Sequence, residues 1–372
     1  MLIELAGACL LLALPAAPGT QAQAASAAAR PVVVRADKLL LGDGTTLDAA
    51  AILIEGGRIQ SFGKQVDVPQ GAGVVEHRGW ASAGLVALHG FAGAAGETRD
   101  STRPVLDARV AWAFDPAHPD FADALAAGIT TLVLTPEAQS LSGGTSAVVK
   151  SSGGRVLKAE AQLSLGFSSA ALSINRFPTS YASAEAELDA RFEKPVGSFA
   201  RAQRGELPVL METDTRPDVL RALEFAKRHK LRGAIYGADW AGELAEPVRE
   251  AGLGVIFAPF DVGTERRTLR SALAIAKAGV PFGFGLDSPW KNPELLRLSA
   301  ALCRREGLDA KLAWQALSSQ AAMLAGVADR VGRIEKGLDA DLVLWSGDPL
   351  DLTSRVEAVY VDGRVAYEAK KP

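Results

Sequence analysis

Cysteine is almost absent from this chain of 372 residues, which contains only Cys9 and Cys303. Cys9 lies in an apolar N-terminal leader, so the chain without that leader cannot form an internal disulfide. A chain of this length does not need one, because its hydrophobic core is large enough without it. Cys303 falls on the apolar side of an expected helix (NPELLRLSAALCRREG), which predicts a buried thiol with no catalytic role.

Long runs of one charge sign are also missing, and the formal net charge is only −3. A protein that follows a phosphate backbone needs a basic stripe, so nucleic acid is not expected as a partner. Neither end of the chain carries an acidic or basic tail. A small molecule therefore remains the most economical expectation for what the protein binds.

The first 24 residues resemble a secretory signal peptide in their organisation. An apolar run is followed by prolines and then by Ala22-Gln23-Ala24, which fits the pattern of small residues at a cleavage site. Glu4 departs from the usual positive start, and the alternative is an uncleaved anchor, for which the run is short. The sequence predicts an exported protein, periplasmic or secreted, with no membrane attachment after cleavage.

Both ends of the remaining chain are rich in short strand patterns. Residues 31–83 alternate aliphatic and β-branched runs with turn dipeptides such as Asp43-Gly44 and Gly56-Gly57, and Asp362-Gly363 marks a similar turn near the C-terminus. Residues 31–83 and 331–372 are therefore predicted to form one small β-sandwich domain, in which strands from the two ends complement each other.

The middle of the chain, residues 84–330, alternates apolar runs of strand length with amphipathic helical stretches. This alternation predicts a parallel sheet covered by helices. The length of the region is typical of an eight-fold β/α barrel. A doubly wound open sheet is the competing fold, which is weakened because the first β–α unit has no glycine-rich turn for a dinucleotide.

Chemistry in a β/α barrel is located at the C-terminal ends of the strands. The residues that end the apolar runs in this region are His89, Glu212, Tyr236 and Asp287. These four residues are therefore the first candidates for a functional site.

Three separated motifs resemble the metal-dependent amidohydrolase superfamily, and its imidazolonepropionase-like branch in particular. They are ASAGLVALHG after the first β region, DALAAGITTLVLTPEAQSLSGG, and AAMLAGVADRVGRIEKGLDADLVLW near the C-terminus. The resemblance implies a metal, usually zinc, at the mouth of a TIM-like barrel. It also implies an aspartate that handles the proton of a metal-bound water during hydrolysis of non-peptide C–N bonds.

The ligand positions that the resemblance implies are only partly kept. His89 and Asp287 match the first histidine and the catalytic aspartate, whereas Phe91, Glu212 and Tyr236 stand where further histidines are expected. The other histidines do not replace them, because we expect His77 in the β domain, His118 in a proline-rich loop and His229 near a helix end. Lys150 is a weak candidate for the bridging lysine of two-metal relatives.

Two interpretations of these replacements remain open. His89, Glu212 and Asp287 could form a one-histidine, two-carboxylate site for one divalent metal, either zinc or a harder ion. Alternatively, Phe91 and Trp290 add apolar bulk where a hydrated metal would lie, Tyr236 packs in the substrate pocket, and no metal binds. In that case Glu212 pairs with a cationic side chain and Asp287 caps the following loop.

These interpretations give two classes of function. The first is an amidohydrolase acting on cyclic amide or imide substrates with a reduced metal site and Asp287 as its catalytic residue. The second is a catalytically inactive homologue that binds a ligand or a partner, either as a homo-oligomer or together with an active relative. Metal-free hydrolysis by a serine is a weaker third option, because the segment GFSSAAL lacks the glycine-serine-glycine elbow.

Overall fold

The computed structural model describes residues 30–94, 107–137 and 139–370. The predicted signal peptide, residues 1–24, lies outside the described residues. Among the residues that are described, no helix combines the length and the apolar character needed to cross a membrane.

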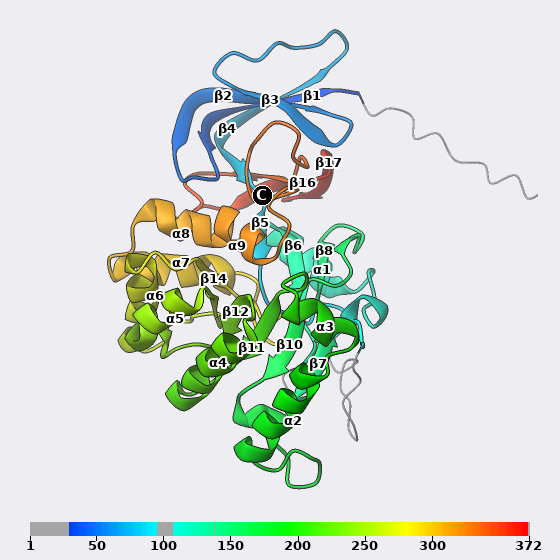
Figure 1. Cartoon of the computed structure of the whole chain (residues 1–372). Helices are drawn as coiled ribbons and strands as arrows, with labels where there is room; N and C mark the ends of the chain where they lie inside the picture. The colour runs from blue at the N-terminus through cyan, green and yellow to red at the C-terminus, as the bar shows by residue number, and fades with distance from the viewer. Residues whose placement is uncertain (1–29, 95–106, 138, 371–372) are drawn as a thin grey trace, which may run out of the picture.

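The two ends of the chain form one seven-stranded sheet, which is the blue and red part of the molecule in Figure 1. Its strands, in the order in which they are paired, are β17 (Arg364–Glu368), β16 (Val356–Val361), β15 (Leu342–Trp345), β4 (Gly73–Ala83), β1 (Val32–Leu40), β2 (Thr46–Glu55) and β3 (Arg58–Gly63). Strands β1 and β4 are parallel, and the other neighbours are antiparallel. The contribution of both ends to this sheet agrees with the sequence, whereas a sandwich of two sheets stays a prediction.

The expected turns connect these strands. Gly44 and Gly57 have positive φ values of 82° and 79°, and Asp362 and Gly363 have values of 50° and 72°. Glycine and aspartate tolerate this conformation better than other residues, which explains their place in these turns.

The central region forms two further sheets. The six-stranded sheet consists of β14 (Phe282–Phe284), β13 (Gly254–Phe257), β12 (Gly233–Tyr236), β11 (Val209–Glu212), β10 (Leu163–Gly166) and β7 (Ser142–Thr145). The four-stranded sheet consists of β5 (Leu85–Ala87), β6 (Ile129–Leu134), β8 (Ala147–Lys150) and β9 (Val156–Lys158). Strands β10 to β14 are parallel, and nearly all of their residues are buried.

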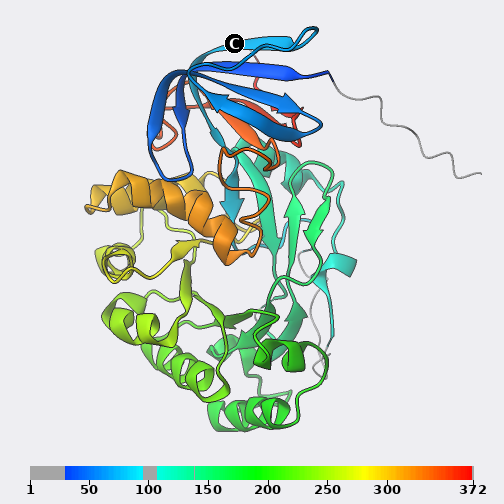
Figure 2. The same cartoon turned by 45° about the horizontal axis from the view of Figure 1, so that its top comes forward.

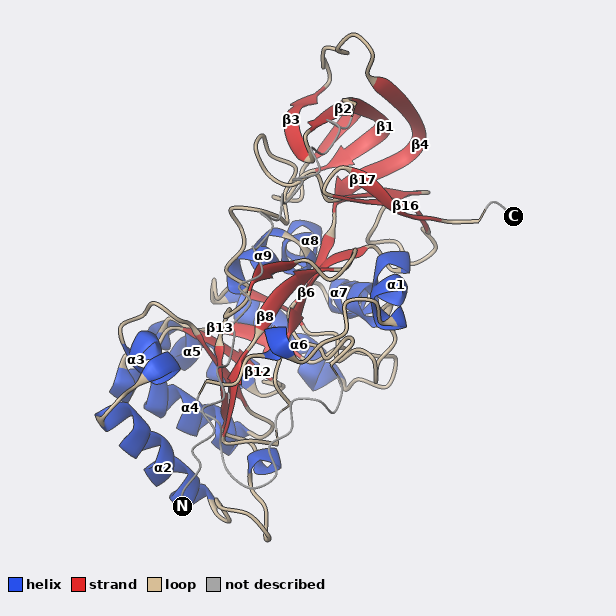
Figure 3. Cartoon of the chain, turned by 90° about the vertical axis from the view of Figure 1, so that its right-hand side faces the viewer, coloured by secondary structure: helices blue, strands red, loops and turns tan. Residues whose placement is uncertain are grey.

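Helices surround these two sheets (Figures 2 and 3). They are α1 (Pro119–Ala126), α2 (Tyr181–Glu193), α3 (Gly197–Gln203), α4 (Arg216–His229), α5 (Ala245–Ala251), α6 (Arg266–Lys277), α7 (Leu295–Arg305), α8 (Ala310–Leu317) and α9 (Ser319–Leu324). Short 3₁₀ turns lie at Val110–Trp112, Ser169–Ala171 and Ala241–Leu244. Helix α7 carries Cys303 fully buried, as predicted.

The prediction of regularly alternating strands and helices is wrong for residues 135–166. Instead of a helix, this segment forms β7, β8 and β9 before β10, and β8 pairs with β6 in antiparallel orientation. Glycine and serine dominate SLSGGTSAVVKSSGGRV, and these residues favour turns over a helix.

Backbone hydrogen bonds connect the two central sheets at two places, between the edge strands β5 and β14 and between the segments that precede β8 and β10. Leu88 N–H donates to the oxygen of Phe284 over 3.1 Å, and Ser146 N–H donates to the oxygen of Gln162 over 2.9 Å. The region is therefore a mixed α/β fold with its parallel strands side by side, while closure as eight regular β/α units stays a prediction.

A buried ionic cluster joins the seven-stranded sheet to the central region. Lys150, at the end of β8, has a fully buried side chain that pairs with Asp341, with Asp339 at 3.0 Å and with Asp362 at 3.5 Å. Arg330 binds the same Asp339 carboxylate through two hydrogen bonds of 2.8 and 3.1 Å. We call Lys150, Asp339, Asp341 and Asp362 the junction cluster. Lys150 therefore lies at this junction and does not bridge a metal at the strand ends.

Candidate functional site

The strand ends bring together the four residues that the sequence singled out. His89 follows β5, Glu212 ends β11, Tyr236 ends β12, and Asp287 follows β14. We call these four residues the mouth cluster. Leu286 N–H and Asp287 N–H both donate to the oxygen of His89, which fixes the loop after β14 against the end of β5.

Asp287 is the hydrogen-bond acceptor at the centre of the mouth cluster. His89 Nδ1 lies 2.7 Å from Asp287 Oδ1, and the Tyr236 hydroxyl donates to the same oxygen over 2.6 Å. The Tyr236 ring stacks on the His89 ring with centroids 3.6 Å apart and planes 8° apart. On the other side of the imidazole, His89 Nε2 lies 3.8 Å from Glu212 Oε1, which is too long for a hydrogen bond.

Two aromatic residues adjoin this cluster. Phe91 is buried and meets the His89 ring edge-on, with centroids 5.1 Å apart, and it packs against Trp290 at 4.5 Å. Trp290 is 55% exposed. Phe91 N–H donates to the oxygen of Ser288 over 2.7 Å, so the segment with Phe91 and the loop with Trp290 are joined. Whether these rings line a substrate pocket stays a prediction.

The electrostatic environment of the mouth cluster favours an ion pair between His89 and Asp287. Burial alone would lower the pKa of His89, but hydrogen bonding to Asp287 and the charges of Asp287 and Glu212 outweigh it and raise the pKa to about 9. Burial likewise opposes ionisation of Asp287, yet the contact with His89 holds the pKa of that carboxyl below its usual value. The pKa of Tyr236 is well above its usual value because of burial and the neighbouring carboxylates. His89 is therefore an imidazolium at neutral pH, and Tyr236 is a neutral donor.

This donor set does not fit the metal centre that the sequence resemblance implies. Phe91 has no lone pair to donate, and His89 Nδ1 is engaged by the Asp287 carboxylate at 2.7 Å. The predicted ligand set of His89, Glu212 and Asp287 stays a prediction, and in this structure the two carboxylates face opposite nitrogens of the same ring. Within the described part of the chain, no group of three His, Cys, Asp or Glu side chains is placed to hold a metal ion.

Ser164 is a polar neighbour of the site that was not predicted from the sequence. The Ser164 hydroxyl, on β10, donates to Glu212 Oε1 over 3.4 Å. A single serine in a buried strand does not indicate a site in the sequence, because its hydrogen-bond partner lies on the neighbouring strand. The three remaining histidines lie as predicted: His77 in β4, His118 before α1 and His229 at the end of α4.

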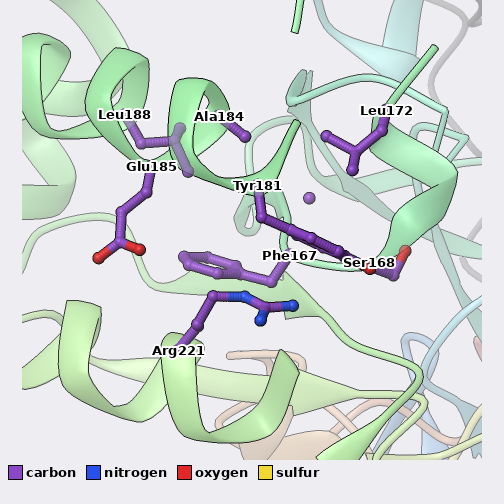
Figure 4. A pocket seen from close by; sticks show the side chains of 9 residues that line it. Phe167, Ser168, Leu172, Tyr181, Ala184, Glu185, Leu188 and Arg221 are labelled. Carbon is purple, nitrogen blue, oxygen red and sulfur yellow. The ribbon is translucent and has the colours of Figure 1, made fainter. Parts of the chain in front are cut away.

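A separate small cavity lies beside the end of β10, between α2 and α4 (Figure 4). Its wall includes Phe167, Tyr181 and Arg221, and the Arg221 guanidinium lies 3.9 Å from the centre of the Tyr181 ring. The cavity volume is about 10 Å³, which leaves room for no more than one water molecule. It is therefore not a substrate site in this conformation.

Comparison with solved structures defines the class of fold. The described fold is similar to an amidohydrolase from Thermotoga maritima MSB8, with 21% sequence identity, a TM-score of 0.81, and coverage of 91% of this chain and 100% of that one. It is also similar to an adenosine deaminase from Xanthomonas campestris with bound zinc, with 17% identity, a TM-score of 0.55, and coverage of 90% and 92%. The mixed α/β fold of this chain is thus similar to that of amidohydrolase structures, which are based on a TIM barrel.

Sequence comparison supports the same superfamily. Residues 225–367, from α4 to β17, match the model of the amidohydrolase family. Two curated relatives are the amidohydrolase tasK of Hapsidospora irregularis, 32% identical over 82 residues, and the imidazolonepropionase of Stenotrophomonas maltophilia (strain R551-3), 34% identical over 99 residues. These matches cover 22% and 25% of this chain, and 8% and 24% of the relatives. The chain thus matches a quarter or less of each relative's length.

Proposed function

We propose that this protein is a non-hydrolytic member of the amidohydrolase superfamily, in which the mouth cluster binds a ligand or supports a partner protein. The observation that carries the proposal is the ion pair between His89 and Asp287. His89 is the histidine of this chain that matches a metal ligand of the superfamily. Its Nδ1 lies 2.7 Å from the Asp287 carboxylate, so this nitrogen is already engaged.

Three features support the loss of the family's metal chemistry. The His89 imidazole lies between the carboxylates of Asp287 and Glu212, where it can supply part of the positive charge that a metal ion would otherwise provide. Phe91 packs against the His89 ring where a second histidine would stand. Tyr236 stacks on the other face of the imidazole and directs its hydroxyl to Asp287 rather than to Glu212.

A second candidate is a hydrolase of non-peptide C–N bonds in cyclic amides or imides, with an altered metal site and a relationship to the imidazolonepropionase-like branch. One observation favours it: His89 Nε2 is buried without a hydrogen-bond partner and faces Glu212 Oε1. Loss of the imidazole proton would present both atoms to one ion. The short match to an imidazolonepropionase is in keeping with this alternative.

Metal analysis of the full chain tests the proposal. We expect the purified protein to remain substoichiometric in zinc and manganese after incubation with each ion and removal of the excess. It should also leave cyclic imides, cyclic amides and amidines unhydrolysed. Stoichiometric metal that is lost in both His89→Ala and Glu212→Gln, but retained in the exposed-site control His118→Ala, would overturn the proposal in favour of the altered hydrolase.

A further inference from the structure

One oxygen of Asp287 remains available at the mouth. Both hydrogen bonds from His89 and Tyr236 reach Oδ1, and among the described residues no hydrogen bond or ion pair reaches Oδ2. The Asp287 side chain is 22% exposed, whereas those of His89 and Glu212 are 2% and 4% exposed. Asp287 is thus the one acidic member of the mouth cluster that a molecule from solution can reach.

The charges of the mouth cluster do not balance. Two carboxylates, those of Glu212 and Asp287, lie beside a single basic side chain, that of His89. Lys291 exerts a favourable charge effect on Asp287, but its backbone N–H, rather than its ammonium group, makes the contact with Asp287. Because an unbalanced charge in a poorly hydrated place is unfavourable, a cation at Oδ2 would stabilise the cluster.

The loop that carries Asp287 also presents an aromatic surface. Trp290 lies three residues further along, and its indole is packed on one side against Phe91 while more than half of the side chain is exposed. Asp287 has a φ of 54°, a left-handed conformation that aspartate tolerates better than most residues. Backbone hydrogen bonds from Asp287 to His89 and from Phe91 to Ser288 hold this loop in place.

We propose that Asp287 Oδ2 and the exposed face of Trp290 form a recognition site for a small organic cation. Its ligand is a primary ammonium or amidinium group attached to a flat apolar moiety. The carboxylate accepts hydrogen bonds from the cationic head, and the indole packs against the cation or the adjoining apolar part. This inference rests on the proposed function, because it requires the mouth to hold an organic ligand in place of a metal.

Isothermal titration of the full chain with three matched probes tests the charge requirement. Benzylammonium carries the required group, benzyl alcohol is its neutral counterpart, and benzoate reverses the charge. We expect saturable binding of benzylammonium, with the other two probes weaker by on the order of ten-fold or more. Equal binding of benzyl alcohol and benzylammonium would contradict the site.

Two variants locate the binding on the molecule. Asp287→Asn keeps the size of the side chain and tolerates the left-handed backbone, and it should remove the preference for the cation. Trp290→Ala alters an exposed side chain and should weaken binding by on the order of ten-fold without unfolding the protein. The controls Asp48→Asn and Trp112→Ala change an exposed acid in β2 and an exposed tryptophan before α1. If Trp290→Ala binds benzylammonium as tightly as the unaltered chain, the site is not where we place it.

The same titration in the presence of EDTA separates this inference from the proposed function. If the chain holds a stoichiometric metal and benzylammonium binds only without EDTA, the amine coordinates the metal and both ideas are wrong. If the chain is metal-free but shows no preference for the cation, the recognition site alone is wrong.

Discussion

His89 is the residue of the mouth cluster that distinguishes the two candidate functions. It is 2% exposed, stacked on Tyr236, and placed between two carboxylates. A neutral histidine in this position could bind a metal through Nε2, whereas an imidazolium acts only as a hydrogen-bond donor and a positive charge. The protonation state of one side chain therefore separates the two candidate functions.

Raising the pH should destabilise the protein through His89. Its pKa is raised from 6.5 to about 9 on folding, so the stabilisation is complete below pH 6.5 and disappears as the pH rises through about 9. The shift corresponds to about 3 kcal/mol in the free energy of unfolding. Urea denaturation across this interval should show the decline in the unaltered chain and in His118→Gln, but not in His89→Gln. A free energy of unfolding that is constant from pH 6.5 to 9 would show that His89 is neutral.

Tyr236→Phe isolates the hydroxyl from the ring. The variant keeps the stack on His89 but leaves Asp287 Oδ1 with one donor in place of two. Because hydrogen bonds to charged groups are worth more than neutral ones, we expect a loss of about 2 kcal/mol in the free energy of unfolding. Chemical denaturation measures it, with Tyr367→Phe in β17 as the matched control. No difference between the two variants would mean that water replaces the lost donor without cost.

The residues of this site could be predicted from the sequence, but their mutual arrangement could not. The end of an apolar run identifies His89, Glu212, Tyr236 and Asp287, because the C-terminal ends of parallel strands meet at one edge. Which carboxylate faces Nδ1 and which faces Nε2 depends on side-chain rotation and on the loop after β14. For that reason the predicted ligand set of His89, Glu212 and Asp287 stays a prediction.

Among the secondary-structure elements, the segment from β7 to β9 is the part that the sequence pattern did not predict. Strands β5, β6 and β10 to β14 are buried, and the residues that end the apolar runs identify β5, β11, β12 and β14 from the sequence. Between β6 and β10, short strands and glycine turns replace the expected helix. Pairing of β8 with β6 places Lys150 against three aspartates, a contact between distant segments that has no local sequence signal.

Replacing Lys150 of the junction cluster should lower the free energy of unfolding. Lys150→Met leaves the buried carboxylates of Asp339 and Asp341 without their shared lysine, and breaking a buried ion pair on one side typically costs about 3–5 kcal/mol. Thermal and urea unfolding measure the loss, with the exposed Lys277→Met as the control. Adding Asp341→Leu to Lys150→Met should recover part of it, because the unpaired charge is then removed. If the double variant is less stable than Lys150→Met alone, the carboxylate has other stabilising partners.

The whole molecule is held together by a core that crosses its predicted domain boundary at residue 84. Val343, Trp345 and Val359 of the terminal sheet belong to the same buried cluster as residues of the central strands. The Trp345 indole N–H donates to Ser82 over 2.9 Å, and β4 continues almost directly into β5. Sequence patterns identify which segments are strands. They do not show that the β-rich ends and the central region of strands and helices share one core.

The predicted barrel region, residues 84–330, should therefore not fold stably when it is expressed alone. It would lose the apolar partners from β15 and β16 and all three aspartates of the junction cluster, so Lys150 would be buried without a counter-charge. We expect aggregation or a non-cooperative thermal transition, measured by circular dichroism and size-exclusion chromatography. A chain that ends at residue 363 is the matched control, because it lacks residues 364–372, which contain only one strand, β17, and the residues of that strand are largely exposed. This control should unfold cooperatively, whereas cooperative unfolding of residues 84–330 near the melting temperature of the full chain would establish that the barrel is an independent domain.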